Sequence, residues 1–270
     1  TSNGGGNNTY VANALAVMKI LDEYYKAGWD VPKVAFYTNS NSGRAMDVLY
    51  DEVYQSHPEY SHLWFNWEGK PMIIGNSAQA SSAVRQFFRI KESQWPNDAN
   101  KKEDGMPWME FHRSLTEDAI YTYNGKKIIN VSVAQHNVTC RMSAAAWYGA
   151  GDRTRSYSDG FVKKDEDAVQ YGYNFAEQWE FALANDPDLI FITGFNEWIA
   201  QRQPANASEP IVFVDNASME ASRDTEPMRG GYGDNYYLQM VEYIRRFKGT
   251  QSDVPTDNAA TIDINGGFGQ

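Results

Sequence analysis

The chain has 270 residues, a mass of 30.6 kDa and a formal net charge of −11. This length allows one domain with a full core, and the acidic balance argues against nucleic acid and anionic membranes as partners, because no basic stripe is present to neutralise phosphates. The single cysteine, Cys140, excludes an internal disulfide, and with four scattered histidines and no apolar run of roughly 18 residues we expect no metal, no cofactor and no membrane insertion.

Apolar residues recur with two periods, one typical of amphipathic helices and one typical of short buried strands. In chain order, we expect a helix over 8–28, a strand over 33–38, a helix over 45–57, strands over 71–75, 86–92 and 127–134, a helix over 167–185, strands over 189–194 and 211–215, and a closing helix over 236–248. Helices and short apolar strands that take turns are typical of a parallel sheet.

This order predicts an α/β fold of the (β/α)8 TIM-barrel type, in which eight parallel strands form the barrel. Six strands are visible, and the opening Thr-Ser-Asn-Gly-Gly-Gly suits a loop just past the end of a strand. We therefore expect a barrel truncated at the N-terminus by about two strands. Residues 1–250 form the expected partial catalytic domain, and the polar residues 251–270, which contain Pro and Gly, are typical of a linker that enters a β-rich module.

The stretch from Asp188 to Trp198 is a buried apolar strand that ends in an acid between an amide and an indole, Asn196, Glu197 and Trp198. The carboxyl ends of barrel strands carry the catalytic groups. Glu197 can exchange a proton, Asn196 can bind hydroxyls and Trp198 offers a ring face, which together suit a sugar. In the alternative interpretation, Glu197 only favours the N-terminus of the next helix.

Hydrolysis of a glycosidic bond needs two carboxyl groups across the bond, in different protonation states. Our preferred partner for Glu197 is Glu92 at the end of the third predicted strand, with the indole of Trp95 nearby and Lys91 on the opposite face by strand alternation. A salt bridge to a loop lysine is the alternative role of Glu92. Arg223 could bind an acid or a sugar, and it lies among other candidate acids, which are Glu220, Asp224 and Glu226. The alternative for these acids is helix capping and loop salt bridging.

Other residues also suit a sugar site. His136, at the end of the fourth predicted strand, is a candidate to donate to a substrate hydroxyl or to orient a carboxylate, and a structural loop hydrogen bond is the alternative. Trp108 and Trp147 lie in long loops and, with Trp95, are candidate stacking platforms. In contrast, Glu68 in Glu-Gly-Lys is expected to serve only in a hairpin turn.

Three segments carry a family resemblance: Phe195 to Trp198 after the Asp-Pro-Asp-Leu-Ile-Phe-Ile strand, Ser222 to Pro227, and Asp234 to Tyr237 at the start of the last helix. Together they resemble the glycoside hydrolase family 71/99-like barrels. Family 99 contains endo-α-mannosidases and endo-α-mannanases, so the resemblance implies a barrel that acts on glycans. Its members carry Asn-Glu-Trp-His-Glu with both acids in the catalytic machinery, whereas this chain has Ala200 in place of the second acid. The mechanism and the α-mannoside specificity of family 99 therefore do not transfer.

Two functions are expected. The first is a glycoside hydrolase that cleaves an oligosaccharide or polysaccharide with paired carboxylates, secreted or located in the periplasm or at the cell surface, with an appended carbohydrate-binding module. The second is a non-catalytic carbohydrate-binding barrel that has lost one acid, at Ala200. A weaker third is an enzyme that acts on polysaccharide during its export. A second carboxylate within about 10 Å of Glu197 distinguishes the first two, since hydrolysis needs one and binding does not.

Overall fold

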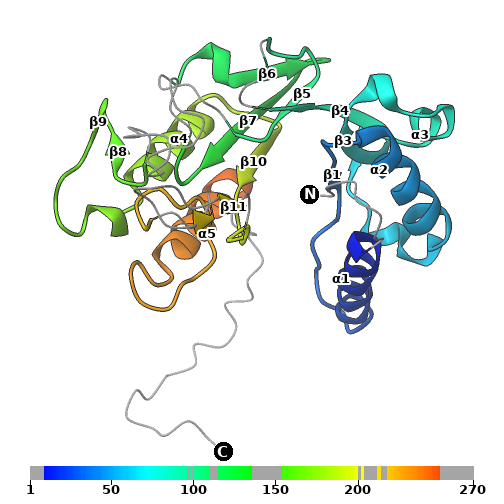
Figure 1. Ribbon diagram of the computed structural model, residues 1–270, viewed down its shortest axis with the longest axis horizontal. Coiled ribbons are helices and arrows are strands. Elements are labelled where there is room, and N and C mark those ends of the chain that lie inside the picture. Colours follow the sequence, from blue (N-terminus) through cyan, green and yellow to red (C-terminus); the bar gives the residue numbers. More distant parts are fainter. Residues whose placement is uncertain are drawn as a thin grey trace, which may run out of the picture.

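The computed structural model describes residues 9–95, 98, 100–109, 115–135, 154–199, 202–203, 212–213 and 218–249. Within these residues the protein has a mixed α/β fold with two main sheets. Figure 1 shows that each sheet has its own group of helices. The predicted module at 251–270 and the candidate site residue His136 lie outside the described residues.

The first sheet contains four parallel strands in the order β1 (Phe36–Tyr37), β3 (Lys70–Gly75), β4 (Arg89–Gln94) and β5 (Gly105–Pro107). A further strand, β2 (Asn66–Trp67), pairs antiparallel with β3. The turn between them contains Glu68 and Gly69, whose φ angles are 49° and 82°. Two consecutive residues with positive φ are typical of a tight hairpin turn. The predicted hairpin at Glu68 is therefore confirmed.

Three helices, α1 (Thr9–Lys26), α2 (Ser42–Leu49) and α3 (Ser82–Phe87), accompany the first sheet (Figure 1). In register, Phe36 lies beside Ile73, and Ile73 lies beside Ile90. Ile73 belongs to the core cluster that also contains Met46 of α2 and Val84 of α3, and Phe36 and Ile90 pack against it, so this face of the sheet is its helix-covered, outer face. A π-helix (Tyr50–Gln55) and two 3₁₀-helices (Pro58–Leu63 and Ser77–Gln79) complete this half of the chain.

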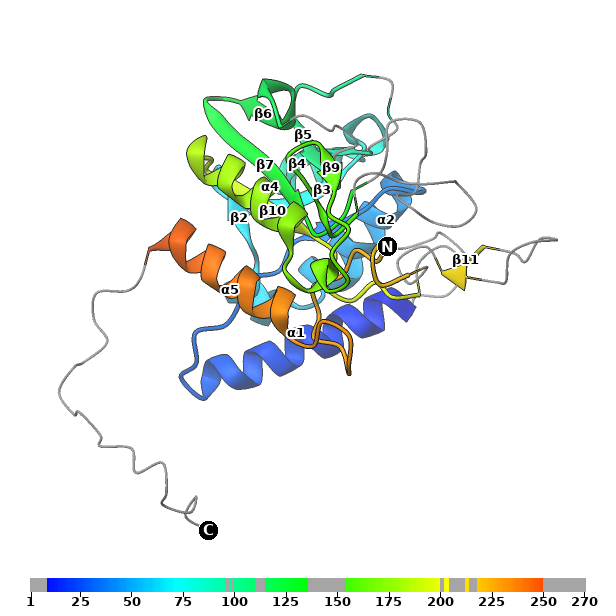
Figure 2. The ribbon, with the colours of Figure 1, turned by 90° about the vertical axis from the view of Figure 1, so that its left-hand side faces the viewer.

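The second sheet has the order β10 (Leu189–Thr193), β7 (Lys126–Ser132) and β6 (Ile120–Tyr123), in which β10 and β7 are parallel and β6 is antiparallel to β7. Helices α4 (Tyr173–Ala184) and α5 (Asn235–Lys248) lie beside it in Figure 2. Ile129 and Val131 of β7 share a core cluster with Phe175 and Trp179 of α4. The remaining elements are 3₁₀-helices at Glu117–Ala119 and Ala168–Gln170 and the strands β8 (Tyr157–Ser158), β9 (Phe161–Val162), β11 (Arg202–Gln203) and β12 (Val212–Phe213).

A third core cluster connects the two sheets. It contains Met72 and Ile74 of β3, Met106 of β5 and Ile128 of β7, with Phe191 of β10 packed against it. Ile74 neighbours Ile73 in the strand and therefore points to the face opposite the helices. This inner face is where the interior of a barrel would lie, but β1 and β10 end their sheets in the described residues, so the barrel stays a prediction.

Several predicted elements need correction. The strand expected over 211–215 is not a further parallel strand, because β12 pairs antiparallel with β11. The strand expected from residue 86 begins at Arg89, because its first two residues belong to α3. This helix starts after Ser81, whose hydroxyl accepts a hydrogen bond from the Val84 backbone N–H. The helix expected over 45–57 is an α-helix followed by a π-helix. The helices in the described part of the chain include none long and apolar enough to cross a membrane.

Candidate functional site

The site around Glu197 begins with a sharp change of direction after β10. Gly194 has a φ of 81°, and a Cβ at this position would lie 2.1 Å from the carbonyl oxygen of Arg223. Only glycine fits there without a shift of the backbone. Beyond it, Phe195 and Asn196 are exposed, while Glu197 and Trp198 are half-buried. The turn therefore presents the predicted acid at the surface, directly after the carboxyl end of a strand.

Residues 222–226, which we call the clamp segment, fix the backbone of this turn. The N–H of Glu197 donates to Oδ1 of Asp224 at 2.7 Å. The N–H groups of Thr225 and Glu226 donate to the carbonyl oxygens of Gly194 and Phe195, at 3.2 and 2.8 Å. Asp224 is fully buried, with an exposed fraction of 0%. Its predicted role as a catalytic acid is therefore replaced by a structural one, since substrate cannot reach it.

Trp198 and Glu226 form the second link between the turn and the clamp segment. The indole Nε1 of Trp198 donates to Oε2 of Glu226 at 2.5 Å. Both side chains are half-buried. This hydrogen bond fixes the orientation of the indole ring. It also brings the carboxylate of Glu226 into contact with the residue that follows Glu197. Trp198 and Glu226, both predicted from the sequence, are thus brought together.

A buried arginine, which was not predicted from the sequence, binds the backbone of the clamp segment. Arg155 has an exposed fraction of 0%, and its Nη2 donates to the carbonyl oxygen of Asp224 at 2.6 Å. Its guanidinium lies 4.3 Å from the ring centroid of Tyr232 and 4.2 Å from that of Tyr236. Burial raises the pKa of Tyr236 well above its ordinary value, so the phenol of Tyr236 stays a neutral partner for the cation.

Glu220 anchors a loop and is not available for catalysis. Its carboxylate accepts hydrogen bonds from the N–H of Ser156 at 2.9 Å, from the hydroxyl of Ser156 at 2.8 Å and from the hydroxyl of Thr154. These bonds attach the start of the segment that carries Arg155 to the residues before the clamp segment. Glu220 therefore has a structural role, as in the alternative interpretation, but its partners are Thr154 and Ser156 and not a helix N-terminus or a basic side chain.

Glu92 lies on the outer face of the first sheet. In register it is beside Gly75, two residues beyond the pair Ile73 and Ile90, so it shares their helix-covered face. Its two carboxylate oxygens lie 3.3 and 3.4 Å from the backbone N of Ser77, which donates to them. Lys91 does point to the opposite face, as expected, and pairs with Asp104. The partner of Glu92 is a backbone N–H and not a loop lysine, and no contact among the described residues joins Glu92 to Glu197.

Trp95, Trp108 and Arg223 form a column at the carboxyl ends of β4 and β5. The two indoles are stacked, with ring centroids 4.6 Å apart and an interplanar angle of 18°. The guanidinium of Arg223 lies 5.4 Å from the centroid of Trp108, and Arg223 is only 3% exposed. Trp108 therefore lies between Trp95 and Arg223 in this column, and both indoles are half-buried.

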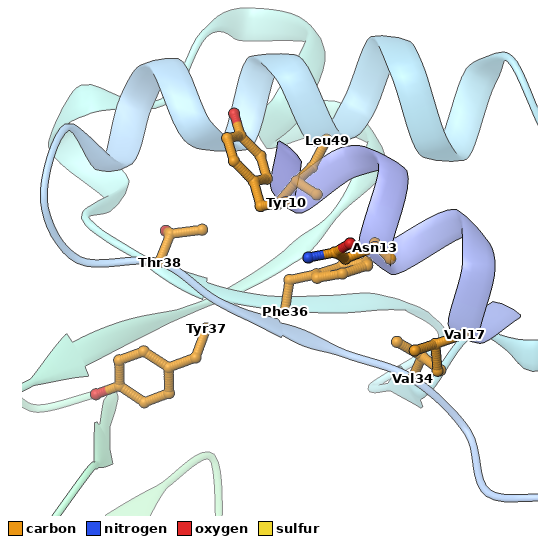
Figure 3. A pocket seen from close by; sticks show the side chains of 9 residues that line it. Tyr10, Asn13, Val17, Val34, Phe36, Tyr37, Thr38 and Leu49 are labelled. Atoms are coloured by element: carbon orange, nitrogen blue, oxygen red, sulfur yellow. The ribbon is translucent and has the colours of Figure 1, made fainter. Parts of the chain in front are cut away.

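Two cavities lie on either side of β1. One, of about 350 Å³, separates Tyr10, Asn13 and Val17 of α1 from Val34 and Phe36 (Figure 3). The other, of about 600 Å³, lies on the inner face between β1 and β10, where Tyr37 and Phe191 line it. Among the described residues that line these cavities, none is a candidate site residue predicted from the sequence.

The described residues contain no cluster of three or more His, Cys, Asp or Glu arranged to hold a metal ion. The candidate residues His136 and Trp147 lie outside the described part of the chain. The chain matches no protein-family model, no curated protein and no solved structure. The assignment of a function therefore depends on the geometry around Glu197 and on the sequence motif that contains it.

Proposed function

We propose that the chain is a glycoside hydrolase and that Glu197 is a catalytic carboxyl group for the cleavage of a glycosidic bond in an oligosaccharide or polysaccharide. The observation that supports this most is the way Glu197 is held. Its backbone is fixed by the buried Asp224, while its side chain stays half-buried at the end of a strand. A fixed backbone beneath an accessible acid is what a positioned proton donor or acceptor needs.

Glu226 is the best partner acid among the described carboxylates near Glu197. Asp224 is fully buried, and Glu220 is committed to Thr154 and Ser156. Glu226 is half-buried and accepts the indole N–H of Trp198. A hydrogen bond from a neutral donor suits a carboxylate that carries negative charge. We therefore assign proton donation to the leaving group to Glu197, and to Glu226 the role of the ionised carboxylate on the other side of the bond.

The neighbouring side chains suit a sugar substrate. Asn196 is exposed and can bind hydroxyl groups, while the ring of Trp198 is oriented by its bond to Glu226. Trp95 adds an aromatic surface at the end of β4. These groups would bind a neutral, hydroxyl-rich ligand without a metal or a cofactor. The same groups, without turnover, would serve the alternative function of a carbohydrate-binding protein.

The test is release of reducing sugar from a panel of glycans. Glu197→Gln keeps the shape of the side chain but cannot transfer the proton, so we expect turnover to fall by roughly 10²-fold or more, with glycan binding little changed. Glu242→Gln is the matched control, because Glu242 is an exposed carboxylate on α5 and lies outside the clamp segment and the turn that carries Glu197. Undiminished turnover by Glu197→Gln would contradict the assignment, and binding without any sugar release from the native chain would favour the non-catalytic alternative.

A further inference from the structure

Two exposed aromatic rings meet at the turn that carries the proposed catalytic residue. Phe195 follows Gly194 and precedes Asn196, and 46% of its surface is exposed. Tyr237, in the first turn of α5, is 38% exposed. Their ring centroids are 6.5 Å apart with an interplanar angle of 65°, so the two rings meet edge to face. The pair therefore presents aromatic surface from two separate elements at one place.

Both rings are attached to fixed backbone. The carbonyl oxygen of Phe195 accepts the N–H of Glu226 at 2.8 Å, and the next two residues lead to the Glu197 N–H, which Asp224 holds. Tyr237 follows Tyr236, which is 1% exposed and contacts the buried Arg155. A ligand that stacks on this pair would find the rings already in position, which lowers the ordering cost of binding.

Two other exposed aromatic residues, Tyr171 and Phe161, have polar or charged local partners. Tyr171 is 53% exposed, and its hydroxyl is bound to Asp167. Phe161 is 56% exposed, and the ammonium of Lys163 lies 3.9 Å from its ring centroid. In the described residues, Phe195 has only the edge of Tyr237 as an aromatic neighbour. Among the described residues no cation lies over this ring, which is exposed beside Asn196.

We propose that Phe195 and Tyr237 form a sugar-stacking subsite next to the catalytic centre, which deepens the proposed function of the Glu197 site. One pyranose ring of the glycan stacks its C–H face on this pair, while the exposed amide of Asn196 binds its hydroxyl groups. The net charge of −11 and the carboxylates of Glu197 and Glu226 disfavour uronic acids and sulfated sugars. The ligand class is therefore a neutral glycan long enough to occupy both this subsite and the catalytic centre.

Affinity electrophoresis tests the subsite without requiring hydrolysis. Native gels that contain a neutral polysaccharide (mannan, xylan, mixed-linkage glucan or dextran) or an acidic one (alginate or polygalacturonate) are run with the intact chain and its variants. We expect retardation by at least one neutral polymer, and a dissociation constant about tenfold weaker for Phe195→Ala and Tyr237→Ala, as befits the loss of an aromatic contact. Phe195→Leu should behave like Phe195→Ala, since it is apolar but cannot stack, whereas Phe195→Trp should retain binding.

Tyr24→Ala is the control, because it removes an exposed aromatic ring on α1, in the other half of the chain. Thermal melts establish that each variant is folded. If Tyr237→Ala does not fold, Tyr237→Phe is used in its place and should retain binding, because it keeps the ring. Native-like retardation of folded Phe195→Ala, or the absence of retardation by every neutral polymer, would overturn the subsite. Binding that depends on Phe195, without sugar release, would contradict hydrolysis but support the subsite. Sugar release with an unchanged KM in Phe195→Ala would support hydrolysis but contradict the subsite.

Discussion

At the residue scale, Glu197 depends on a short series of contacts that begins far from it in the sequence. Tyr232 and Tyr236 enclose Arg155, Arg155 binds the carbonyl group of Asp224, and the carboxylate of Asp224 binds the N–H of Glu197. Each contact in the series is buried or half-buried, so water competes little for it. The position of Glu197 is thus set by groups that are themselves buried.

Asp224→Ala should break this series. The variant leaves the N–H of Glu197 without its buried acceptor, and we expect a loss of about 1 to 3 kcal/mol in the free energy of unfolding. Turnover should fall more than KM rises, because the acid is displaced while the sugar-binding side chains remain. Asp224→Asn keeps an acceptor oxygen and should restore most of both properties. Urea unfolding and steady-state kinetics give the two readouts, and a native kcat in folded Asp224→Ala would show that the clamp does not position Glu197.

At the element scale, the pairing of α4 with α5 combines a buried contact with an exposed one. Trp179 of α4 stacks on Tyr243 of α5, with centroids 5.3 Å apart and an interplanar angle of 4°. Above them, Glu180 accepts two hydrogen bonds from Arg246, at 2.5 and 2.8 Å, and one from the hydroxyl of Tyr243 at 3.0 Å. The Arg246 guanidinium lowers the pKa of Glu180 below its ordinary value. The aromatic stack supplies the larger share of the stabilisation, because the ion pair is exposed to solvent.

The exposed pair makes a pH-dependent prediction. A lowered pKa in the folded state means that the stabilisation by Glu180 is complete above the pKa of the unfolded state and is lost as the pH falls through the folded-state pKa. Glu180→Gln should therefore cost less than about 1 kcal/mol at pH 7, since solvent screens the pair, and this difference should vanish in strong acid. Urea unfolding of the native chain and of Glu180→Gln, at pH 7 and in strong acid, measures this difference in the free energy of unfolding, with Glu242→Gln as a control. A difference that grows toward low pH would contradict the assignment.

The sequence predicted the helices and strands in which the apolar pattern extends over many residues. It missed the short strands and the strand pairings that depend on long-range contacts. The strand β5 has only three residues, Gly105 to Pro107, and Gly105 is required because a Cβ there would lie 2.9 Å from the ring of Tyr121. The apolar run at 211–215 gave a strand but could not give its partner, since an apolar run does not encode parallel or antiparallel pairing.

The residues of the candidate site divide in the same way, into those that a local pattern predicts and those whose role depends on long-range contacts. Glu197 and its neighbours follow a strand directly, so the local pattern identified them. The positioning roles of Asp224 and Arg155 arise from hydrogen bonds between residues 27 and 69 positions apart, for which the sequence holds no local signal. Strand alternation correctly separated Glu92 from Lys91, but it could not say which face is inner. That choice is made by the helices, which cover the face of Ile73 and Ile90.

At the scale of the whole molecule, the two sheets face one another across the inner cluster. We infer that they are two arcs of a (β/α)8-type barrel that lie on opposite sides of the cavity between β1 and β10. Tyr37 of β1 supports this view, because its ring lies 6.0 Å from that of Phe191 of β10, and its hydroxyl donates to the carbonyl oxygen of Met106 at 3.0 Å. Burial raises the pKa of Tyr37 far above its ordinary value, so the hydroxyl stays a donor.

A double-mutant cycle on Tyr37 and Phe191 tests this arrangement. If the terminal strands of the two sheets face each other in solution, Tyr37→Leu and Phe191→Leu should show a coupling free energy of about 0.5 to 1.5 kcal/mol, because each substitution removes the same aromatic contact. The stacked pair Trp179 and Tyr243 lies within one layer and should couple whether or not the sheets face each other, so it serves as the positive control. Additive effects of the Tyr37 and Phe191 substitutions, to within about 0.3 kcal/mol, would separate the two sheets and remove the barrel arrangement. Since Glu197 follows β10 and Trp95 follows β4, the same result would also separate these two sides of the proposed glycan site.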